Sequence, residues 1–263
     1  MKNGRNSMAT SAAIALLIGL TTGCLAQTDT GAPSLLWVNV TRVKPDMTQE
    51  WEKIQQNEFT PALKKGGVPF REVWQTAMFG DPFEYALVTP IQKFAQFDGP
   101  SALVKALDKD GAATLLNKVR RCVADTHGSA VRFRPDLSIM GNMQEAELAV
   151  ISTVRVASGR SQDFENWLKN DYVPALKKAE PAGYMVHQTV FGGNANDWVT
   201  LLLIKKFGDL DAGPMLNRAV GEEAASKIIA KAAGIVISLE RSVSRHRADL
   251  SYSAAPAKAG GAQ

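Results

Sequence analysis

Three polar residues lie on segments whose other side chains are mostly apolar, and the same three residue types recur 113 positions later in the chain. The six residues are Arg42, Gln75, Arg134, Arg155, Gln188 and Arg247. A polar side chain on a buried strand needs a hydrogen-bonding partner. That partner can be another side chain, in which case the residues form a network that orients strands or joins the two halves of the chain. It can also be the carbonyl or carboxylate of a small ligand, in which case they line a pocket.

One histidine is the best candidate for acid–base chemistry. His187 stands where the first half of the chain has Trp74, so the two halves cannot hold identical pockets. An imidazole beside Tyr184, Gln188 and Trp198 is suited to a general base or an axial haem ligand, and a buried histidine bonded to its neighbours is the simpler interpretation. We take His187 as the candidate catalytic base. The candidate ligand-binding residues are Arg155, Gln188, Tyr184, Trp198, Arg42, Gln75 and Trp74.

Familiar catalytic motifs are absent from the sequence. It contains no HExxH, CxxC, GxSxG, P-loop or GxGxxG pattern, which argues against metalloprotease, hydrolase, nucleotide and dinucleotide sites. His127, His187 and His246 do not have metal-ligand spacing with one another or with a cysteine. We therefore expect no metal and no cofactor, except that His187 leaves a bound haem possible.

The chain contains one unit written twice. Residues 60–65 (TPALKK) return as residues 173–178 (VPALKK). Residues 35–138 align with residues 148–251 without a gap, and roughly 29 of about 104 aligned positions are identical, several times what composition alone would give. The chain therefore divides into an export signal (1–26), a linker (27–34), repeat one (35–140), repeat two (148–251) and a disordered tail (252–263).

Each repeat shows the order β-α-β-β-α-β. Strands are predicted at 35–43, 71–77, 84–90 and 129–134, and at 148–156, 184–190, 198–204 and 242–247; helices are predicted at 48–65, 100–123, 161–178 and 214–235. This order is the ferredoxin-like pattern, an α+β fold whose helices cover one face of an antiparallel sheet. The first and third strands are apolar on both faces, so the other sheet face also needs a cover. We expect the two repeats to pack together as a pseudo-dimeric α+β barrel within one chain.

These features resemble the dimeric α+β barrel superfamily, and within it NIPSNAP-type and antibiotic-biosynthesis-monooxygenase-type domains. The resemblance covers both repeats and rests on Val43-Lys44-Pro45-Asp46, Trp51, Pro61-x-Leu63-Lys64-Lys65 and Trp74-Gln75-Thr76. Members usually pair as homodimers, so the resemblance implies that the repeats replace two subunits. The superfamily includes cofactor-independent oxygenases, haem-degrading enzymes, and dechlorination and isomerisation enzymes, so the fold does not settle the function. Haem-degrading relatives are expected to carry their histidine on a helix, and the helices predicted here have none.

The N-terminal segment has the pattern of an export signal. Lys2 and Arg5 precede an apolar core at 12–20 that is too short to span a bilayer. Cys24-Leu25-Ala26 before Gln27 suits ordinary signal peptidase, whereas residues 20–24 also resemble a lipobox that would make Cys24 the lipidated first residue. The protein is therefore expected to be periplasmic or secreted, or to be a lipoprotein whose anchor is its one contact with the membrane.

Charge and cysteine content limit the partners further. The formal net charge of +4 falls to 4 − 2 = +2 once Lys2 and Arg5 are removed with the signal. This is too little for a nucleic-acid-binding surface, and no basic stripe interleaved with aromatic residues occurs. After ordinary cleavage Cys122 is the single remaining cysteine, so an intrachain disulfide is excluded.

Three functions are consistent with these observations. The first is an exported protein that binds a small, partly apolar molecule, with repeat two around His187 and Gln188 as the favoured binding unit. The second is a cofactor-independent monooxygenase in which His187 takes a proton and Arg155 or Gln188 holds the resulting anion. The third is a structural or interaction module of the cell envelope whose interior is filled by side chains.

Overall fold

The computed structural model of the chain describes residues 34–142 and 146–253. The predicted export signal, and the linker apart from Ser34, lie outside the described residues, as does most of the predicted tail. The described part belongs to one compact unit. None of its helices is long and apolar enough to cross a membrane.

Repeat one forms a four-stranded antiparallel sheet. Its strands are β1 (Leu35–Val43), β2 (Phe70–Met78), β3 (Glu84–Ile91) and β4 (Val123–Phe133), paired in the order β4-β1-β3-β2. This is the ferredoxin-like order predicted from the sequence. Strand β4 starts at Val123, six residues earlier than predicted, because its polar first half also pairs with β1.

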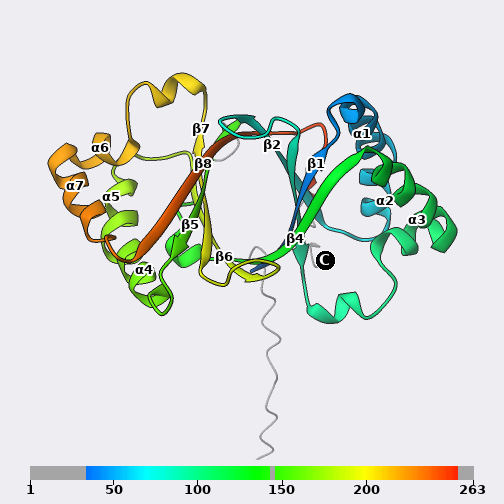
Figure 1. Cartoon of the computed structure of the whole chain (residues 1–263), viewed down its shortest axis with the longest axis horizontal. Coiled ribbons are helices and arrows are strands. Elements are labelled where there is room, and N and C mark those ends of the chain that lie inside the picture. Colours follow the sequence, from blue (N-terminus) through cyan, green and yellow to red (C-terminus); the bar gives the residue numbers. More distant parts are fainter. Residues whose placement is uncertain (1–33, 143–145, 254–263) are drawn as a thin grey trace, which may run out of the picture. The chain divides into compact units, whose positions relative to one another are not determined.

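Repeat two repeats this arrangement. Its strands are β5 (Leu148–Val156), β6 (Tyr184–Phe191), β7 (Asp197–Ile204) and β8 (Val236–His246), paired in the order β8-β5-β7-β6. The edge strands of the two sheets then pair with each other, β4 with β6 and β2 with β8. Together these pairings close an eight-stranded antiparallel barrel (Figure 1). Closure leaves none of these strands with an unpaired edge.

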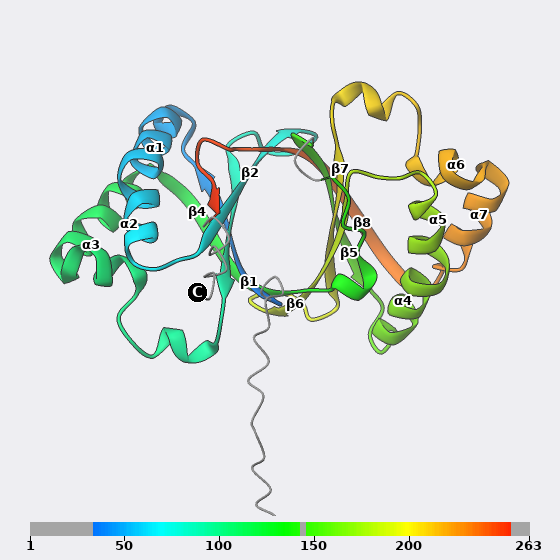
Figure 2. The same ribbon diagram turned by 180° about the vertical axis from the view of Figure 1, so that it is seen from behind.

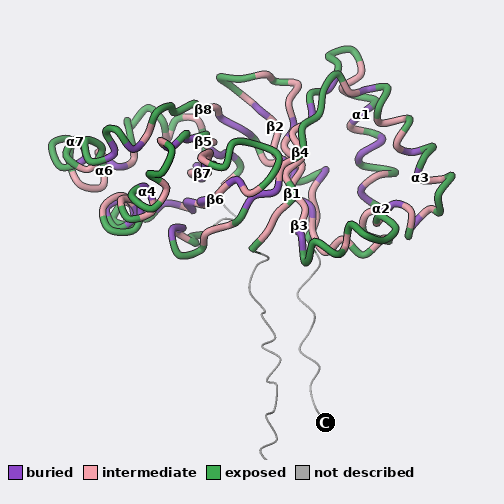
Figure 3. Tube along the Cα trace, turned by 60° about the horizontal axis from the view of Figure 1, so that its bottom comes forward, coloured by how far each residue is buried: buried purple, intermediate pink, exposed green. Residues whose placement is uncertain are grey.

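Helices cover the outer face of each half of the barrel (Figure 2). Repeat one contributes α1 (Thr48–Ile54), α2 (Thr60–Lys65) and α3 (Ala102–Cys122), and repeat two contributes α4 (Ser161–Trp167), α5 (Val173–Lys177), α6 (Met215–Val220) and α7 (Glu222–Ala230). Two buried apolar clusters lie between helices and strands, one in each half. Figure 3 shows the buried stretches in the strands and on parts of the helices. The predicted α+β barrel is therefore confirmed, with the second face of each sheet forming the barrel interior.

A single π-helical turn precedes each repeated proline. Residues Gln55–Phe59 form this turn between α1 and α2, and Leu168–Tyr172 form it between α4 and α5. Proline has no N–H and disturbs the regular hydrogen-bond ladder of a helix. The helix therefore restarts at Thr60 and Val173, with the proline in the first turn of the new segment.

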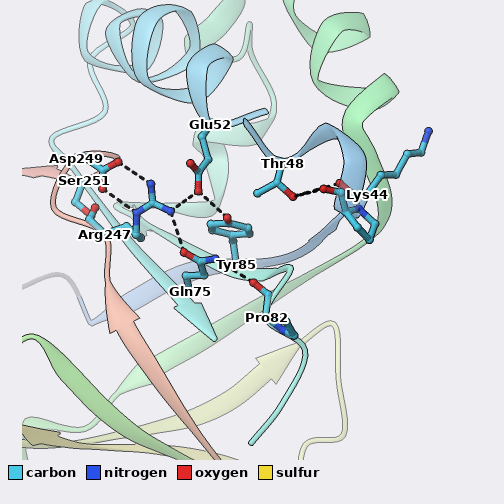
Figure 4. Close-up of polar contacts among 10 residues, drawn as sticks. Lys44, Thr48, Glu52, Gln75, Pro82, Tyr85, Arg247, Asp249 and Ser251 are labelled. Carbon is cyan, nitrogen blue, oxygen red and sulfur yellow. Dashed lines mark hydrogen bonds and ion pairs between the residues drawn. The ribbon is translucent and has the colours of Figure 1, made fainter. Parts of the chain in front are cut away.

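The end of each repeat docks on the other repeat. After β4, Leu137 enters the buried cluster of repeat two, and after β8, Leu250 enters that of repeat one. Arg247 bonds to Glu52 on α1 and, at 2.9 Å, to Gln75 on β2 (Figure 4). We call residues 134–138 and 247–251 the exchanged arms. They explain why the sequence Arg-x-Asp-Leu-Ser occurs at the end of both repeats.

The start of the C-terminal tail differs from the prediction. Tyr252 and Ser253 form a short strand, β9, that pairs with Arg71 and Phe70 at the start of β2. The low-complexity composition of residues 252–263 predicted disorder, but the preceding arm holds these first two residues against β2. The remaining tail residues, 254–263, lie outside the described part of the chain.

Candidate ligand-binding site

A cavity of about 480 Å³ lies in repeat one, between the outer face of the sheet and the helices. Strands β1 and β3 form one wall, α2 and α3 another, and the loops before β2 and α3 complete the lining. The aromatic and larger aliphatic lining residues are Trp37, Phe59, Leu63, Val68, Leu87, Phe97, Leu103 and Leu116. A few polar groups interrupt this apolar surface: Asn39, Arg71, Thr89, Gln92, Gln96, Ser101 and Lys105.

Strand alternation explains which side chains face the cavity. Trp37 pairs with Thr89, and Asn39 pairs with Leu87. Residues two apart on a strand point to the same face, so these four side chains share the helix-covered side of the sheet. Trp37 also contacts Phe97 edge to face, with 5.6 Å between ring centroids. One end of the cavity is therefore aromatic.

The π-helical turn brings two polar residues onto one face of the helix. The N–H of Thr60 bonds to the carbonyl of Gln55, a spacing of five residues that is typical of a π-helix. In a regular α-helix, residues five apart would point in clearly different directions. Here both side chains accept a hydrogen bond from Arg71 on β2: Nη1 lies 2.8 Å from Thr60 Oγ1, and Nη2 lies 2.6 Å from Gln55 Oε1.

Arg71 is a buried cation at the edge of this cavity. Its side chain is 1% exposed and lies over the ring of Phe59, 5.4 Å from the ring centroid. Burial lowers the pKa of its guanidinium to about 10, so the group stays protonated at pH 7. Neighbouring Tyr252 is neutral at that pH, because burial raises its pKa to about 12. Among the described residues, the ion pairs at 4 Å or less include none to Arg71.

The sequence-predicted residues are divided between the two faces of the sheet. Tyr184 and Trp198 belong to the apolar cluster beneath the helices. Tyr184 and Val186 point to that face of β6, so His187, the residue after Val186, points to the other face, into the barrel. Gln188 pairs with Trp198, and His187 pairs with Val199. The structure therefore does not bring His187 together with the three neighbours that the sequence suggested.

The same division holds in repeat one and at the junctions between sheets. Trp74 points into the barrel and contacts His246, with 5.0 Å between ring centroids. His187 contacts Phe133 in the equivalent place, at 5.4 Å. Gln75 lies on the helix-covered face, where it accepts a bond from Arg247 and donates one to the carbonyl of Pro82 (Figure 4).

The repeated arginines form ion pairs with other side chains. Arg42 bonds to Asp81 and Arg155 to Asp197, each at 2.7 Å and each on an exposed arginine. Arg134 bonds to Asp136 and, across the repeats, to Glu165 on α4. Arg247 makes the matching bonds to Asp249 and Glu52. The sequence allowed either a side-chain network or a ligand pocket for these arginines. Arg134 and Arg247 fit the network, which joins the two halves.

Hydrogen bonds also set the charge state of these arms. The bonds from Arg134 and Arg247 hold the pKa of Asp136 and of Asp249 below the usual range. Burial alone would raise the pKa of Glu52, but the bonds from Arg247 and Tyr85 outweigh it, so that pKa is also lowered. All three carboxylates are therefore ionised at neutral pH.

The described cavity lining does not fit a haem held by a protein ligand. It contains no histidine, cysteine, methionine or tyrosine, the side chains that ligate haem iron. In the part of the chain that the structure describes, no three His, Cys, Asp or Glu side chains are grouped to hold a metal ion. A second depression, of about 690 Å³, is lined by Thr114, Asn117, Lys118, Arg120 and Arg121. These residues all lie on α3, so this depression has one wall and does not enclose a ligand.

Sequence reasoning missed Arg71, Gln55 and Thr60. A signal was available in the comparison of the repeats, where the aligned residues of repeat two are Tyr184, Leu168 and Val173. Repeat one has three polar residues where repeat two has three apolar or aromatic ones, and these positions are buried in both copies. His187 for Trp74 drew attention instead, because histidine is the more familiar catalytic residue.

Known structures share the architecture built up above. One assigned as a monooxygenase from Lactobacillus acidophilus NCFM superimposes with a TM-score of 0.56 over 83% of this chain and 95% of its own, at 10% identity. The chain has the dimeric α+β barrel fold. An anthrone oxidase-like protein shares this α+β barrel, with a TM-score of 0.55 at 9% identity over 84% of this chain and 94% of its own. A mutant chlorite dismutase from Candidatus Nitrospira defluvii shares it too, with a TM-score of 0.55 at 8% identity over 84% of this chain and 94% of its own. No family model and no curated protein matches the sequence. At these identities the likeness establishes the α+β barrel and leaves the activity open.

Proposed function

We propose that the protein binds a small, partly apolar molecule in the cavity of repeat one. The observation that carries this proposal is the cavity itself. Its volume of about 480 Å³ is in the range of small-molecule sites, and its wall combines aromatic and aliphatic surface with a few polar groups. The sequence favoured repeat two as the binding unit, whereas the described cavity lies in repeat one.

A neutral fluorescent naphthalene ketone, prodan, tests this proposal, because its emission shifts to the blue in apolar surroundings. We expect saturable binding of one molecule per chain. Thr89→Trp places a large ring next to Trp37 on the cavity wall and is expected to weaken binding by about tenfold or more. Ile237→Ser is the control, because it removes a 65% exposed apolar side chain outside the cavity lining.

The two variants separate cavity binding from surface adsorption. Binding that survives Thr89→Trp and weakens with Ile237→Ser would mean that the probe adheres to exposed apolar surface. No saturable binding to the wild type would favour the structural or interaction module of the cell envelope.

A second candidate is a cofactor-independent oxygenase. It is favoured by the shared fold, since one similar structure is assigned as a monooxygenase and another is described as anthrone oxidase-like. An activated aromatic or enolic substrate would react with oxygen directly once a base has removed a proton. His187 remains the proposed base, neutral at pH 7 and weakened by the burial that lowers its pKa to about 4. Its substrate would have to enter the barrel, because His187 is absent from the described cavity lining.

Oxygen uptake with anthrone as the test substrate separates the oxygenase from the binder. The oxygenase proposal expects uptake that depends on His187 and is lost in His187→Ala, with prodan binding retained. Equal uptake by the wild type and the variant would remove His187 from the mechanism. Absence of uptake in the wild type would leave binding as the supported function.

We further propose export, supported by Lys2, Arg5 and the apolar stretch that follows them. The intact mass of protein from the secreted and membrane fractions tests this, since it separates a chain beginning at Gln27 from one with a lipidated Cys24. The finer NIPSNAP-type assignment likewise remains a proposal, supported by residues 43–46 and 74–76.

A further inference from the structure

The fold of the repeat does not require the charge of Arg71, because a neutral residue can occupy the same position. Repeat two has the same π-helical turn and the same strand, with Leu168, Val173 and Tyr184 in place of Gln55, Thr60 and Arg71. Those three residues pack in one buried apolar cluster. A buried charge costs free energy that an apolar replacement of similar size avoids. The position therefore accepts a neutral residue in this very fold.

The hydrogen-bonding capacity of Arg71 is only partly used. A guanidinium has five N–H groups, and the structure gives two hydrogen bonds to this one, from Nη1 to Thr60 and from Nη2 to Gln55. Three N–H groups therefore have no hydrogen-bond acceptor among the described residues. Both acceptors are neutral, so the positive charge is oriented by its neighbours and left uncompensated.

Arg71 belongs to the cavity lining, which places this unused capacity beside the cavity. Arg71 is one of two cations in the described lining, and the other, Lys105, is exposed. Phe59 lies against the guanidinium, and Trp37 and Phe97 form another part of the lining. A ligand that satisfies both features has a flat aromatic body and an anionic group at its inner end.

Resting on the binding function proposed above, we propose that the cavity of repeat one recognises an aromatic carboxylate, whose oxygens accept hydrogen bonds from the guanidinium of Arg71. The planar fork of arginine matches the two oxygens of a carboxylate. Gln55 and Thr60 orient the fork and act as positioning residues. The carboxylate supplies the counter-charge that the protein lacks at this point.

Calorimetric titration with 2-naphthoate and its neutral analogue 2-naphthamide tests this proposal. A charge-assisted hydrogen bond in a buried site predicts that the wild type binds naphthoate about 10- to 100-fold more tightly than naphthamide. The triple variant Gln55→Leu, Thr60→Val, Arg71→Tyr copies repeat two and is expected to bind both compounds equally. Lys109→Gln neutralises an exposed cation on the same helix, α3, but outside the cavity lining, and is expected to retain the preference.

Each outcome bears on the proposal. Equal binding of the two compounds by the wild type, no binding of naphthoate, or a preference that survives the triple variant would overturn it. Because calorimetry is independent of prodan, prodan binding without a carboxylate preference refutes this inference and leaves the binding function intact. Should the triple variant unfold, Arg71→Lys is the second test, and we expect it to lower the naphthoate preference at least about threefold through loss of the planar fork.

Discussion

The buried histidine in the barrel makes a quantitative prediction about pH. His187 is 8% exposed, and burial lowers its pKa to about 4, although a hydrogen bond to the backbone of Val199 offsets part of this effect. In the unfolded chain its pKa returns to the ordinary value of 6.5. Between these two values the unfolded chain binds a proton that the folded chain does not. The free energy of unfolding therefore falls as the pH is lowered from about 7 to about 4.

The size of this effect follows from the two pKa values. The difference is 6.5 − 4 = 2.5 pH units, and each unit corresponds to about 1.4 kcal/mol, so the total loss is roughly 3 kcal/mol. Asp136 and Asp249, whose pKa values are lowered, stabilise the fold above their ordinary pKa and lose this contribution only as the pH falls below about 4. Their effect lies at lower pH and is common to the variants compared.

The assay is urea unfolding followed by tryptophan fluorescence at pH 7, 6, 5 and 4.5. His187→Gln keeps an N–H donor for the backbone and does not titrate, so its stability should decline less over this range than that of the wild type. The difference between the two curves should grow steadily below pH 6.5. Parallel curves for the two proteins would show that His187 titrates normally in the folded state, and the reasoning from its burial would be wrong.

The exchanged arms give two further predictions. Arg247→Gln leaves the carboxylate of Glu52 on α1 without its cation and should lower the free energy of unfolding by roughly 2–3 kcal/mol. Arg155→Gln, at an exposed ion pair, should leave the denaturation midpoint nearly unchanged. Equal midpoints for these two variants would contradict a stabilising arm. Leu137→Ala and Leu250→Ala, each at a 1% exposed position, should each cost about 2–5 kcal/mol, and the exposed Leu239→Ala should cost far less in the same urea titration.

The duplicated sequence predicted the fold well, because packing residues recur at a fixed offset. The recurrence fixed the element order in both halves, and the apolar second face required a cover. Strand register was not predictable, since a shift of one residue moves every side chain to the other face. Gln75 pairs with Tyr85 and Gln188 pairs with Trp198. Strand alternation alone puts Tyr184 and Gln188 on the face opposite His187, and the register adds Trp198 to their face.

The candidate site depended on two features that a sequence pattern does not show. The π-helical turn puts Gln55 and Thr60 on a common face of the helix. A regular α-helix over residues 48–65 would put them on different faces. Arg71 lies at the start of β2, where a charged residue usually faces solvent, yet Tyr252 of β9 pairs with it and helps to bury it. The contact joins residues 181 positions apart, and the recurrence of the repeats gives no hint of it.

Closure of the barrel within one chain has an evolutionary consequence. In a symmetric homodimer every substitution is made twice, so a buried cation introduced into one helix–sheet layer appears in both, and its cost is doubled. In this chain the two layers can mutate independently, and one holds Leu168, Val173 and Tyr184 where the other holds Gln55, Thr60 and Arg71. A duplicated gene can thus use one copy as a scaffold while the other acquires a ligand-binding residue, and the exchanged arms hold the two halves together.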